Sequence, residues 1–271
     1  MKRECVDSGI ARIYIRESLE KASGCFLCYL ENRFEQRYFD NYLNETVMDP
    51  NERERIIKTR GFCNYHFYKI FALSTEPSSN DGLGLALILK SVTEQLLSDV
   101  REPESKKLRL LDLKRWGLKH GSSPLSMTGF LKQIASQVEC PACDHVRTMM
   151  QVYTECFLRE IMEDDQISRL FDTRGTLCVP HYMMTALIAS RDPKKRYESA
   201  AERIKAKQIQ SLEKMQIDLS EYISKQDYKV SEKERLGTER IIGESLAKVA
   251  GKRGSEKISI RILKPAVSEK P

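Results

Sequence analysis

The sequence predicts an all-α protein made of a duplicated helical repeat, in which each half is a small helical bundle pinned by a Cys3His metal site. Two observations carry this expectation. Large apolar residues recur at helical spacing through most of the chain. Four cysteine or histidine positions in the first half also recur at a constant offset in the second half. Strand-like alternation is confined to Lys257–Leu263, where every second residue is isoleucine and no partner strand is evident.

The composition is that of a folded protein. Of the 271 residues, 41% are hydrophobic and 31% are charged, which excludes wholesale disorder and a collagen-like fibre. The longest apolar run, Leu83–Leu89, is far shorter than the roughly 20 residues that a membrane-spanning helix needs. Residues 1–7 lack the apolar stretch of a signal peptide. We therefore expect a soluble, cytoplasmic protein without a membrane partner.

Six of the eight cysteines and two of the four histidines follow one repeated pattern. Cys25 and Cys28 form a CxxC motif, and a CxxH motif, Cys63 to His66, follows it. In both halves 35 residues separate the second cysteine from the third, and a Thr-Arg-Gly sequence precedes each CxxH motif. The same residue types recur 115 positions later, at Cys140, Cys143, Cys178 and His181. This register indicates an internal duplication.

The repeated residues favour zinc as the bound ion. Three thiolates and one imidazole make a tetrahedral Cys3His site, and each CxxC or CxxH pair presents two ligands from a single turn. We expect one zinc ion to be held by Cys25, Cys28, Cys63 and His66, and a second by Cys140, Cys143, Cys178 and His181. An iron–sulfur cluster is the alternative cofactor, because cysteine thiolates also hold iron.

These sites are expected to be structural rather than catalytic. A catalytic zinc ion has three protein ligands and one open position, whereas each set here supplies four. A cytidine-deaminase site would need a proline before the CxxC motif, and in Cys140–Cys143 the proline lies inside it. A thioredoxin-like site would need a preceding strand, but Leu131–Val138 has a helical pattern. The sequence therefore predicts no catalytic residue and no organic cofactor.

Each ligand motif stands at the start of a predicted helix. From Phe26 to Tyr42, large apolar residues recur in steps of four. Because helix N-termini carry partial positive charge, such starts would stabilise thiolates. The predicted helices cover residues 26–43, 50–60, 63–73 and 82–100 in the first repeat, and 125–138, 140–163, 166–173 and 181–190 in the second.

The helix over 50–60 has clear boundary signals. Asp49 can cap it, Pro50 suits its first position, and Glu52 completes a capping box. Gly61 can adopt the left-handed conformation that ends a helix. Gly175 is the corresponding stop in the second repeat.

The net charge of +6 is unevenly distributed. From Arg191 to the end there are 20 Lys and Arg against 13 Asp and Glu, so the preceding residues hold 25 against 26. A basic C-terminal third permits an anionic partner, although a solubilising surface is the commoner explanation. A Cys3His zinc site has a formal charge of −1, and we hypothesise that Arg60 and Arg174, beside the motifs, help to balance it.

Two further segments complete the domain organisation. A basic stretch with the single tryptophan, Trp116, separates the repeats and is interpreted as a solvated linker. A long charged helix is expected over 193–225, and a last helix, capped by Ser231 and Glu234, is expected to run to Ala250. The predicted domains are residues 8–100 (first repeat), 101–124 (linker), 125–230 (second repeat with the long helix) and 231–271 (C-terminal helix and basic tail).

The chain resembles a family of uncharacterised prokaryotic proteins with a duplicated CxxC–CxxH arrangement. The resemblance implies metal binding and a helical fold, and it brings no established activity. Phe26 stands where that family usually has proline, and Gly175–Cys178 is one residue longer than the usual Gly-Phe-Cys form. Neither departure affects a ligand. The resembling segments are Gly24–Cys28, Val47–Pro50, Arg60–Cys63 with His66, Leu83–Ser91, Cys140–Cys143, Cys178–His181 and Asp227–Tyr228.

The sequence therefore favours a non-enzymatic zinc protein with two structural sites that serves as an interaction or scaffold module for a protein partner. Three alternatives stay open. The first is a thiol-based redox or metal sensor, in which oxidation expels the metal. The second is a nucleic-acid-binding protein that uses the basic linker and C-terminal third. The third is an enzyme with an exchangeable ligand such as His66 or His181. The sequence does not indicate an oligomeric state.

Overall fold

The computed structural model describes residues 8–74, 82–101, 140–225 and 240–252. Within these ranges the protein is all-α, with ten α-helices, one short π-helical turn and no strand, which confirms the all-α part of the predicted fold class. The strand pattern at Lys257–Leu263 lies outside the described residues. The elements are α1 (Ser8–Lys21), α2 (Phe26–Asn41), η1 (Tyr42–Thr46), α3 (Pro50–Lys58), α4 (Asn64–Ser74), α5 (Leu83–Arg101), α7 (Pro141–Glu163), α8 (Asp165–Arg174), α9 (Val179–Ser190), α10 (Glu198–Ser224) and α12 (Arg240–Ala250).

The described residues group into two compact units. Unit 1 draws on Met1–Phe34 and Thr148–Pro271, and unit 2 draws on Glu35–Arg147. Both divisions fall inside helices, so that α2 and α7 each contribute one end to unit 1 and the other end to unit 2. The predicted linker over 101–124 lies outside the described residues apart from Arg101.

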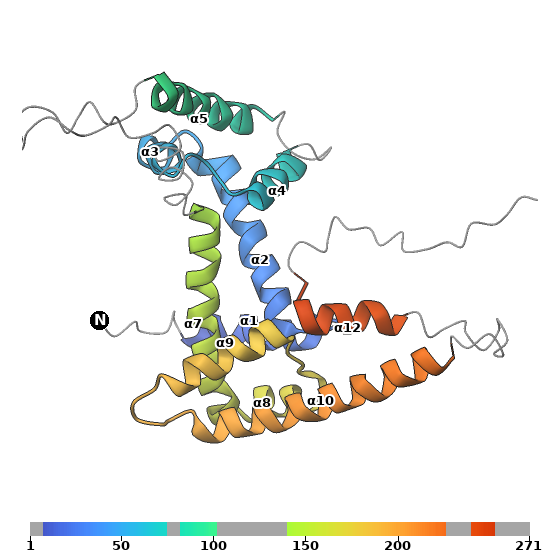
Figure 1. Cartoon of the computed structure of the whole chain (residues 1–271). Coiled ribbons are helices and arrows are strands. Elements are labelled where there is room, and N and C mark those ends of the chain that lie inside the picture. The colour runs from blue at the N-terminus through green and yellow to red at the C-terminus, as the bar shows by residue number, and fades with distance from the viewer. Residues whose placement is uncertain (1–7, 75–81, 102–139, 226–239, 253–271) are drawn as a thin grey trace, which may run out of the picture. The chain divides into compact units, whose positions relative to one another are not determined.

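Unit 1 is built around a cluster of aromatic rings. The ring of Phe157 on α7 lies 4.8 Å from that of Phe26 on α2 and 5.3 Å from that of Phe171 on α8, measured between centroids. All three side chains are buried. The helix α8 packs against α1, whereas α9, α10 and α12 contact one another and lie side by side (Figure 1).

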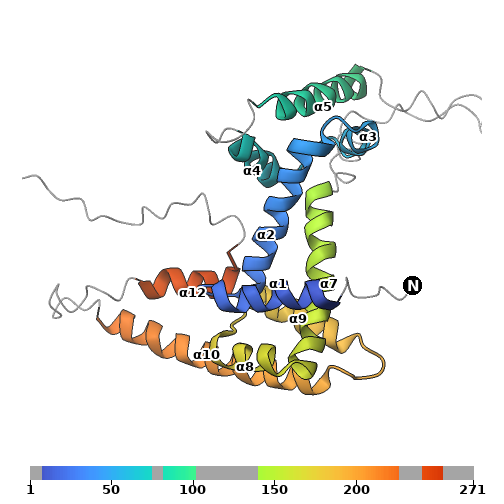
Figure 2. The same cartoon turned by 180° about the vertical axis from the view of Figure 1, so that it is seen from behind.

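Unit 2 has a second core, into which the far end of α2 extends. Phe39 and Tyr42 from the α2–η1 segment are fully buried against Phe62, and α5 packs on α3 and α4 (Figure 2). The aromatic spacing of four that predicts this helix therefore matches its buried face. The predicted end at residue 43 falls within η1, where the backbone widens into a π-helical turn.

The described helix boundaries lie close to the predicted ones, with two differences, whereas the predicted helix over 125–138 and the predicted cap at Ser231 and Glu234 lie outside the described residues. The Asp49 carboxylate caps α3 by accepting from the N–H of Asn51, but Glu52 pairs with Arg55 at 3.7 Å instead of closing a capping box. The long helix α10 begins at Glu198, later than predicted. The cause is a turn in which the Asp192 carboxylate accepts from the N–H of Arg196 at 2.6 Å.

The two stop glycines act for different reasons. Gly61 has φ +94°, the left-handed conformation predicted for it. Gly175 has φ −63°, so its backbone would suit any residue. A Cβ atom at Gly175, however, would lie 2.3 Å from the ring of Phe171. Close approach to the preceding helix therefore requires glycine at position 175.

None of the helices in the described ranges combines the length and the apolar composition needed to cross a bilayer.

Candidate metal centres

The structure brings all eight predicted ligands together in two groups of four, but it pairs the motifs differently from the prediction. The first CxxC motif meets the second CxxH motif, and the second CxxC motif meets the first CxxH motif. The predicted pairing within each repeat is therefore wrong. The physical reason is that α2 and α7 each start in one unit and end in the other, so that a CxxC motif and the CxxH motif of the same repeat belong to different units.

The Cys28 group lies in unit 1 and consists of Cys25, Cys28, Cys178 and His181. The His181 Nδ1 atom is 3.4, 3.3 and 3.2 Å from the sulfur atoms of Cys25, Cys28 and Cys178, respectively. The sulfur atoms of Cys28 and Cys178 are 3.6 Å apart. All four residues are buried.

The Cys63 group lies in unit 2 and consists of Cys63, His66, Cys140 and Cys143. The His66 Nδ1 atom is 3.2 Å from the sulfur atoms of Cys63 and Cys140 and 3.4 Å from that of Cys143. The sulfur atoms of Cys63 and Cys143 are 3.8 Å apart. In contrast to the Cys28 group, this one has two partly exposed thiols, Cys63 and Cys143.

The spacing of the donor atoms fits one tetrahedral ion in each group. With zinc about 2.3 Å from sulfur and about 2.0–2.1 Å from nitrogen, a tetrahedron holds N–S pairs about 3.6 Å apart and S–S pairs about 3.8 Å apart. The N–S distances of 3.2–3.4 Å and the S–S distances of 3.6 and 3.8 Å are close to these values. All donor atoms of a group lie within 4.8 Å of one another, and no fifth side chain is needed to complete the shell.

Each group forms where two helices begin. Cys25 directly precedes α2 and Cys178 is the N-cap of α9, so the starts of both helices face the Cys28 group. Likewise Cys63 directly precedes α4 and Cys140 directly precedes α7. This confirms the predicted placement of the motifs at helix N-termini, whose partial positive charge and free N–H groups favour thiolates.

The pKa values of the thiols show how strongly these groups depend on a cation. Burial acts to raise the pKa of Cys25, but hydrogen bonds from the side chains and backbone N–H groups of Cys178 and Cys28 lower it well below its usual value. Hydrogen bonding to Cys178 and Cys25, together with burial, raises the pKa of Cys28. Burial raises the pKa of Cys140 to about 12, against the effect of backbone N–H groups. A divalent cation between the three sulfur atoms of the Cys28 group would stabilise all of them as thiolates.

A carboxylate stands behind each histidine. The His66 Nε2 atom lies 2.9 Å from the Glu35 carboxylate, which is itself 2% exposed and also accepts from Tyr65 Oη at 2.8 Å. The His181 Nε2 atom lies 3.5 Å from the Glu31 carboxylate. Such contacts direct Nδ1 toward a metal and raise the basicity of the ring.

The two glutamates are functional candidates that the sequence analysis missed. Cys28, Glu31 and Glu35 fall at positions i, i+3 and i+7 of α2, and therefore on one face of that helix. This spacing from the CxxC motif was a signal that could have identified them.

The hypothesised balancing role of two arginines is not supported by their contacts. The Arg60 guanidinium pairs with the Asp99 carboxylate at 2.8 Å, and Arg174 donates to the carbonyl oxygen of Glu20. The cation beside the Cys28 group is instead Lys248 on α12. Burial lowers the pKa of Lys248, while the charges of Cys25 and Cys178 act to raise it.

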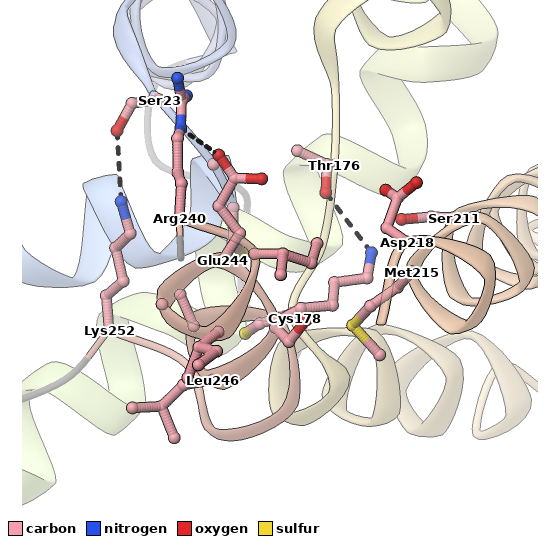
Figure 3. A pocket seen from close by; sticks show the side chains of 18 of the residues that line it. Ser23, Thr176, Cys178, Ser211, Met215, Asp218, Arg240, Glu244, Leu246 and Lys252 are labelled. Carbon is pink, nitrogen blue, oxygen red and sulfur yellow. Dashed lines mark hydrogen bonds and ion pairs between the residues drawn. The ribbon is translucent and has the colours of Figure 1, made fainter. Parts of the chain in front are cut away.

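The end of α12 covers the Cys28 group. Gly251 follows this helix with φ +80°, and a Cβ atom there would lie 3.5 Å from the Cys178 sulfur and 3.8 Å from the Cys28 sulfur. Lys252 donates to Ser23 Oγ at 3.2 Å beside it (Figure 3). A segment far from the ligands in sequence therefore helps to close this site.

Other candidates from the sequence are not part of either group. Trp116 and the basic stretch around it lie outside the described residues, as does Cys5. Cys156 is buried in α7, as its helical position predicts.

The fold and the two groups define a helical protein with two Cys3His clusters that could each hold a metal ion. The chain belongs to a family of unknown function, DUF6062, whose model matches residues 6–256. It is similar to an uncharacterised 23.9 kDa protein encoded in the xynA 3′ region of Caldicellulosiruptor sp. (strain Rt8B.4), with 27% identity over 161 residues. These residues are 59% of this chain and 64% of the relative, so the match spans slightly less than two thirds of the relative's length. No solved structure matches the chain.

Proposed function

We propose that the protein binds two zinc ions at structural Cys3His sites, one in each unit, and acts in the cytoplasm as an interaction or scaffold module. The observation that carries the proposal is the convergence of four donor atoms per group within 4.8 Å, from motifs far apart in the sequence. Four protein ligands complete a tetrahedral shell and leave no open position for a substrate. Thiols in such groups persist best in a reducing compartment.

The donor spacing supports a single ion over a polynuclear cluster. In an iron–sulfur cluster the four protein ligands are shared among two or more iron atoms, so that some ligand atoms lie farther apart than the 4.8 Å within which all donor atoms of a group lie here. Histidine supplies Nδ1 in both groups and has a carboxylate at Nε2, as is common around protein-bound zinc.

The stabilising role follows from how the ligands are connected. Each group joins the starts of two helices that are distant in the sequence, so metal binding would contribute directly to folding. In zinc-finger peptides this contribution is on the order of 10–16 kcal/mol.

An exposed apolar stripe supports the interaction role. Ile242, Leu246 and Val249 are 41%, 56% and 54% exposed and recur at positions i, i+4 and i+7 of α12. A stripe of this kind on a helix is typical of a surface that meets a protein partner.

The first experiment is elemental analysis, together with an assay for acid-labile sulfide, on protein purified anaerobically without added metal. Two zinc ions per chain and no sulfide would support the proposal. Iron with labile sulfide would overturn the structural-zinc assignment, and a metal-free, fully folded protein would overturn metal binding altogether.

A redox or metal sensor is the second candidate, and the Cys63 group favours it. Cys63 and Cys143 are partly exposed and their sulfur atoms are 3.8 Å apart. Peroxide could oxidise one thiolate to a sulfenic acid, with loss of hydroxide, and the second thiol would then form a disulfide with loss of water. The test is reversible release of one of the two metal ions by peroxide and its rebinding after reduction. Release of neither ion, or of both at the same rate, would argue against a sensor at this group.

A further inference from the structure

Unit 1 contains a positively charged cavity that is separate from the metal ligands. It has a volume of about 460 Å³ and is formed by the C-terminal end of α8, the residues that follow it, the middle of α10 and Lys248 of α12. Its lining residues include no aspartate and no glutamate. They include four cationic side chains, namely Arg174, Lys207, Lys214 and Lys248.

None of the four cations forms an ion pair with a carboxylate of the described residues. Arg174 and Lys207 have structural contacts with backbone carbonyl oxygens, those of Glu20 and Phe171, respectively. The carboxylate that acts on Lys207, Asp172, is itself paired with Arg203. Within the described residues, the four positive charges are therefore not offset by ion pairs, and the Asp218 carboxylate lies in the lining of an adjoining cavity.

Lys214 and Lys248, the two remaining cations, make no such contact with a backbone carbonyl oxygen of the described residues. Lys248 donates to the neutral Gln208 Oε1 at 3.0 Å and to Thr176 Oγ1 at 3.4 Å. Lys248 also lies beside Cys25 and Cys178 of the Cys28 group. A Cys3His zinc site has a formal charge of −1, which one cation offsets. That role does not account for Lys214, which lies exposed at the cavity on α10 without a carboxylate partner.

A buried, unpaired donor lies in the same cavity. The Gln208 side chain is 4% exposed, and its Nε2 atom has no hydrogen-bond partner among the described residues. The orientation of this amide is fixed because an ammonium group can only donate, so that the Lys248 contact must be to the amide oxygen. Nε2 is thus an N–H donor without an acceptor, an arrangement that costs free energy unless a ligand supplies one.

A larger, mostly apolar cavity continues from this one, although its lining also includes the carboxylates of Asp218 and Glu244 and the ligands Cys25 and Cys178. It has a volume of about 920 Å³ and shares Thr176, Ser211, Lys214 and Lys248 with the basic cavity. Figure 3 shows Thr176 and Ser211 on the side toward α10, with Met215 beside them and Leu246 on α12, and marks the contact from Thr176 to Lys248. A ligand with its charge at Lys248 would therefore have room for an organic group between α10 and α12.

We propose that this basic cavity binds the phosphate group of a small phosphorylated molecule. Four cations, an unpaired amide donor and the Thr176 and Ser211 hydroxyl groups match a multiply charged anion with several acceptor oxygens. The organic part of the molecule lies in the adjoining apolar cavity. The inference does not depend on which metal the Cys28 group holds.

The test is calorimetric titration of the full-length protein, as purified, with inorganic phosphate and with phenyl phosphate at constant ionic strength. The central variant is Gln208→Glu, which keeps an acceptor for Lys248 but replaces the unpaired donor by a negative charge. It should remain folded and weaken binding about 10-fold or more. Lys214→Gln should weaken binding several-fold. The matched control is Lys205→Gln, which removes one charge from the same helix at a lysine that pairs with Glu202 outside the cavity and should bind as the wild type does.

The two probes distinguish the sources of the phosphate. Tighter binding of phenyl phosphate supports an organic phosphate that extends into the apolar cavity, whereas equal affinity overturns the assignment of an organic part to that cavity and leaves inorganic phosphate as the ligand. Absence of saturable binding at millimolar concentrations, or equal loss in Gln208→Glu and Lys205→Gln, would overturn the proposal. Binding of a single-stranded oligonucleotide but of neither small phosphate would also overturn it, in favour of a nucleic-acid surface.

Discussion

The sulfur atoms of Cys28 and Cys178 lie 3.6 Å apart, although 150 residues separate them in the sequence. Cys28 belongs to the first CxxC–CxxH repeat and Cys178 to the second, and the same exchange brings Cys63 to Cys143 in the other group. Each metal group is therefore completed only by residues from both halves of the chain, and this arrangement leads to predictions that a pairing within each repeat does not make.

Pairs of cysteine substitutions distinguish the two arrangements by counting metal ions. Cys28→Ser with Cys178→Ser damages only the Cys28 group, so this double variant should retain one of two ions. Cys28→Ser with Cys63→Ser damages both groups and should retain none. Metal content measured by elemental analysis checks the prediction. If the Cys28→Ser, Cys178→Ser variant retained no ion and the Cys28→Ser, Cys63→Ser variant retained one, the motifs would pair within each repeat.

If the chain is cut between the two repeats, neither fragment should bind metal as the whole protein does. A cut within residues 102–139 separates the CxxC from the CxxH motif of both groups. We expect each isolated fragment to be largely unfolded, and the mixture to regain helical content on addition of zinc. Circular dichroism of the fragments, alone and mixed, tests this. A stably folded single fragment with one tightly bound zinc would contradict the exchanged pairing.

Glu35 should control the affinity of the Cys63 group through His66. Glu35→Gln removes the negative charge that lies 2.9 Å from His66 Nε2, and loss of such a partner commonly weakens metal binding by about 10- to 100-fold. Competition with a chromophoric chelator measures the effect, in a background of Cys28→Ser and Cys178→Ser that leaves only this group. Glu31→Gln is the matched control, since Glu31 lies one turn earlier on α2 and is paired with His181 of the Cys28 group. If both substitutions weakened metal binding by the Cys63 group equally, Glu35 would not have the role assigned to it through His66.

Two glycines of unit 1 should respond to alanine in opposite ways. At Gly175 a Cβ atom would lie 2.3 Å from the Phe171 ring and 2.7 Å from the Phe171 carbonyl oxygen, so Gly175→Ala should destabilise the protein by about 1–3 kcal/mol. At Gly243, inside α12, a Cβ atom would meet nothing within 4 Å. Gly243→Ala should therefore stabilise the protein by about 0.5–1 kcal/mol. Denaturant unfolding of both variants checks the sign of each change.

The identity of the ligands and the starts of their helices could be predicted because both depend on local chemistry. Cysteine and histidine at CxxC and CxxH spacing indicate their own role, and the apolar steps from Phe26 to Tyr42 match the buried face of α2 and η1. The ligand pairing could not be predicted. In two repeats with the same internal spacing, pairing within a repeat and pairing between repeats use the same residue types, and only the paths of α2 and α7 through the two units decide between them.

The remaining differences come from tertiary contacts that leave little trace in a single sequence. The α10 start depends on how the Asp192 carboxylate holds the N–H of Arg196. The need for glycine at position 175 depends on the proximity of Phe171 and not on a backbone dihedral angle. The spacing of Glu31 and Glu35 from Cys28 places them on the ligand face of α2, but the histidines that they support are identified only by the tertiary structure.

The exchange of motifs between repeats has a consequence for the growing chain on the ribosome. When His66 has been synthesised, the chain holds four ligands with the composition of a complete Cys3His site, yet they belong to two different groups of the finished protein. The Cys63 group can be completed once Cys143 has been added, and the Cys28 group only after His181. A zinc ion captured by the first four ligands would hold a non-native pairing, which must be released before either unit can form. If zinc is captured at that stage, its exchange at the nascent chain should therefore slow the appearance of the native protein.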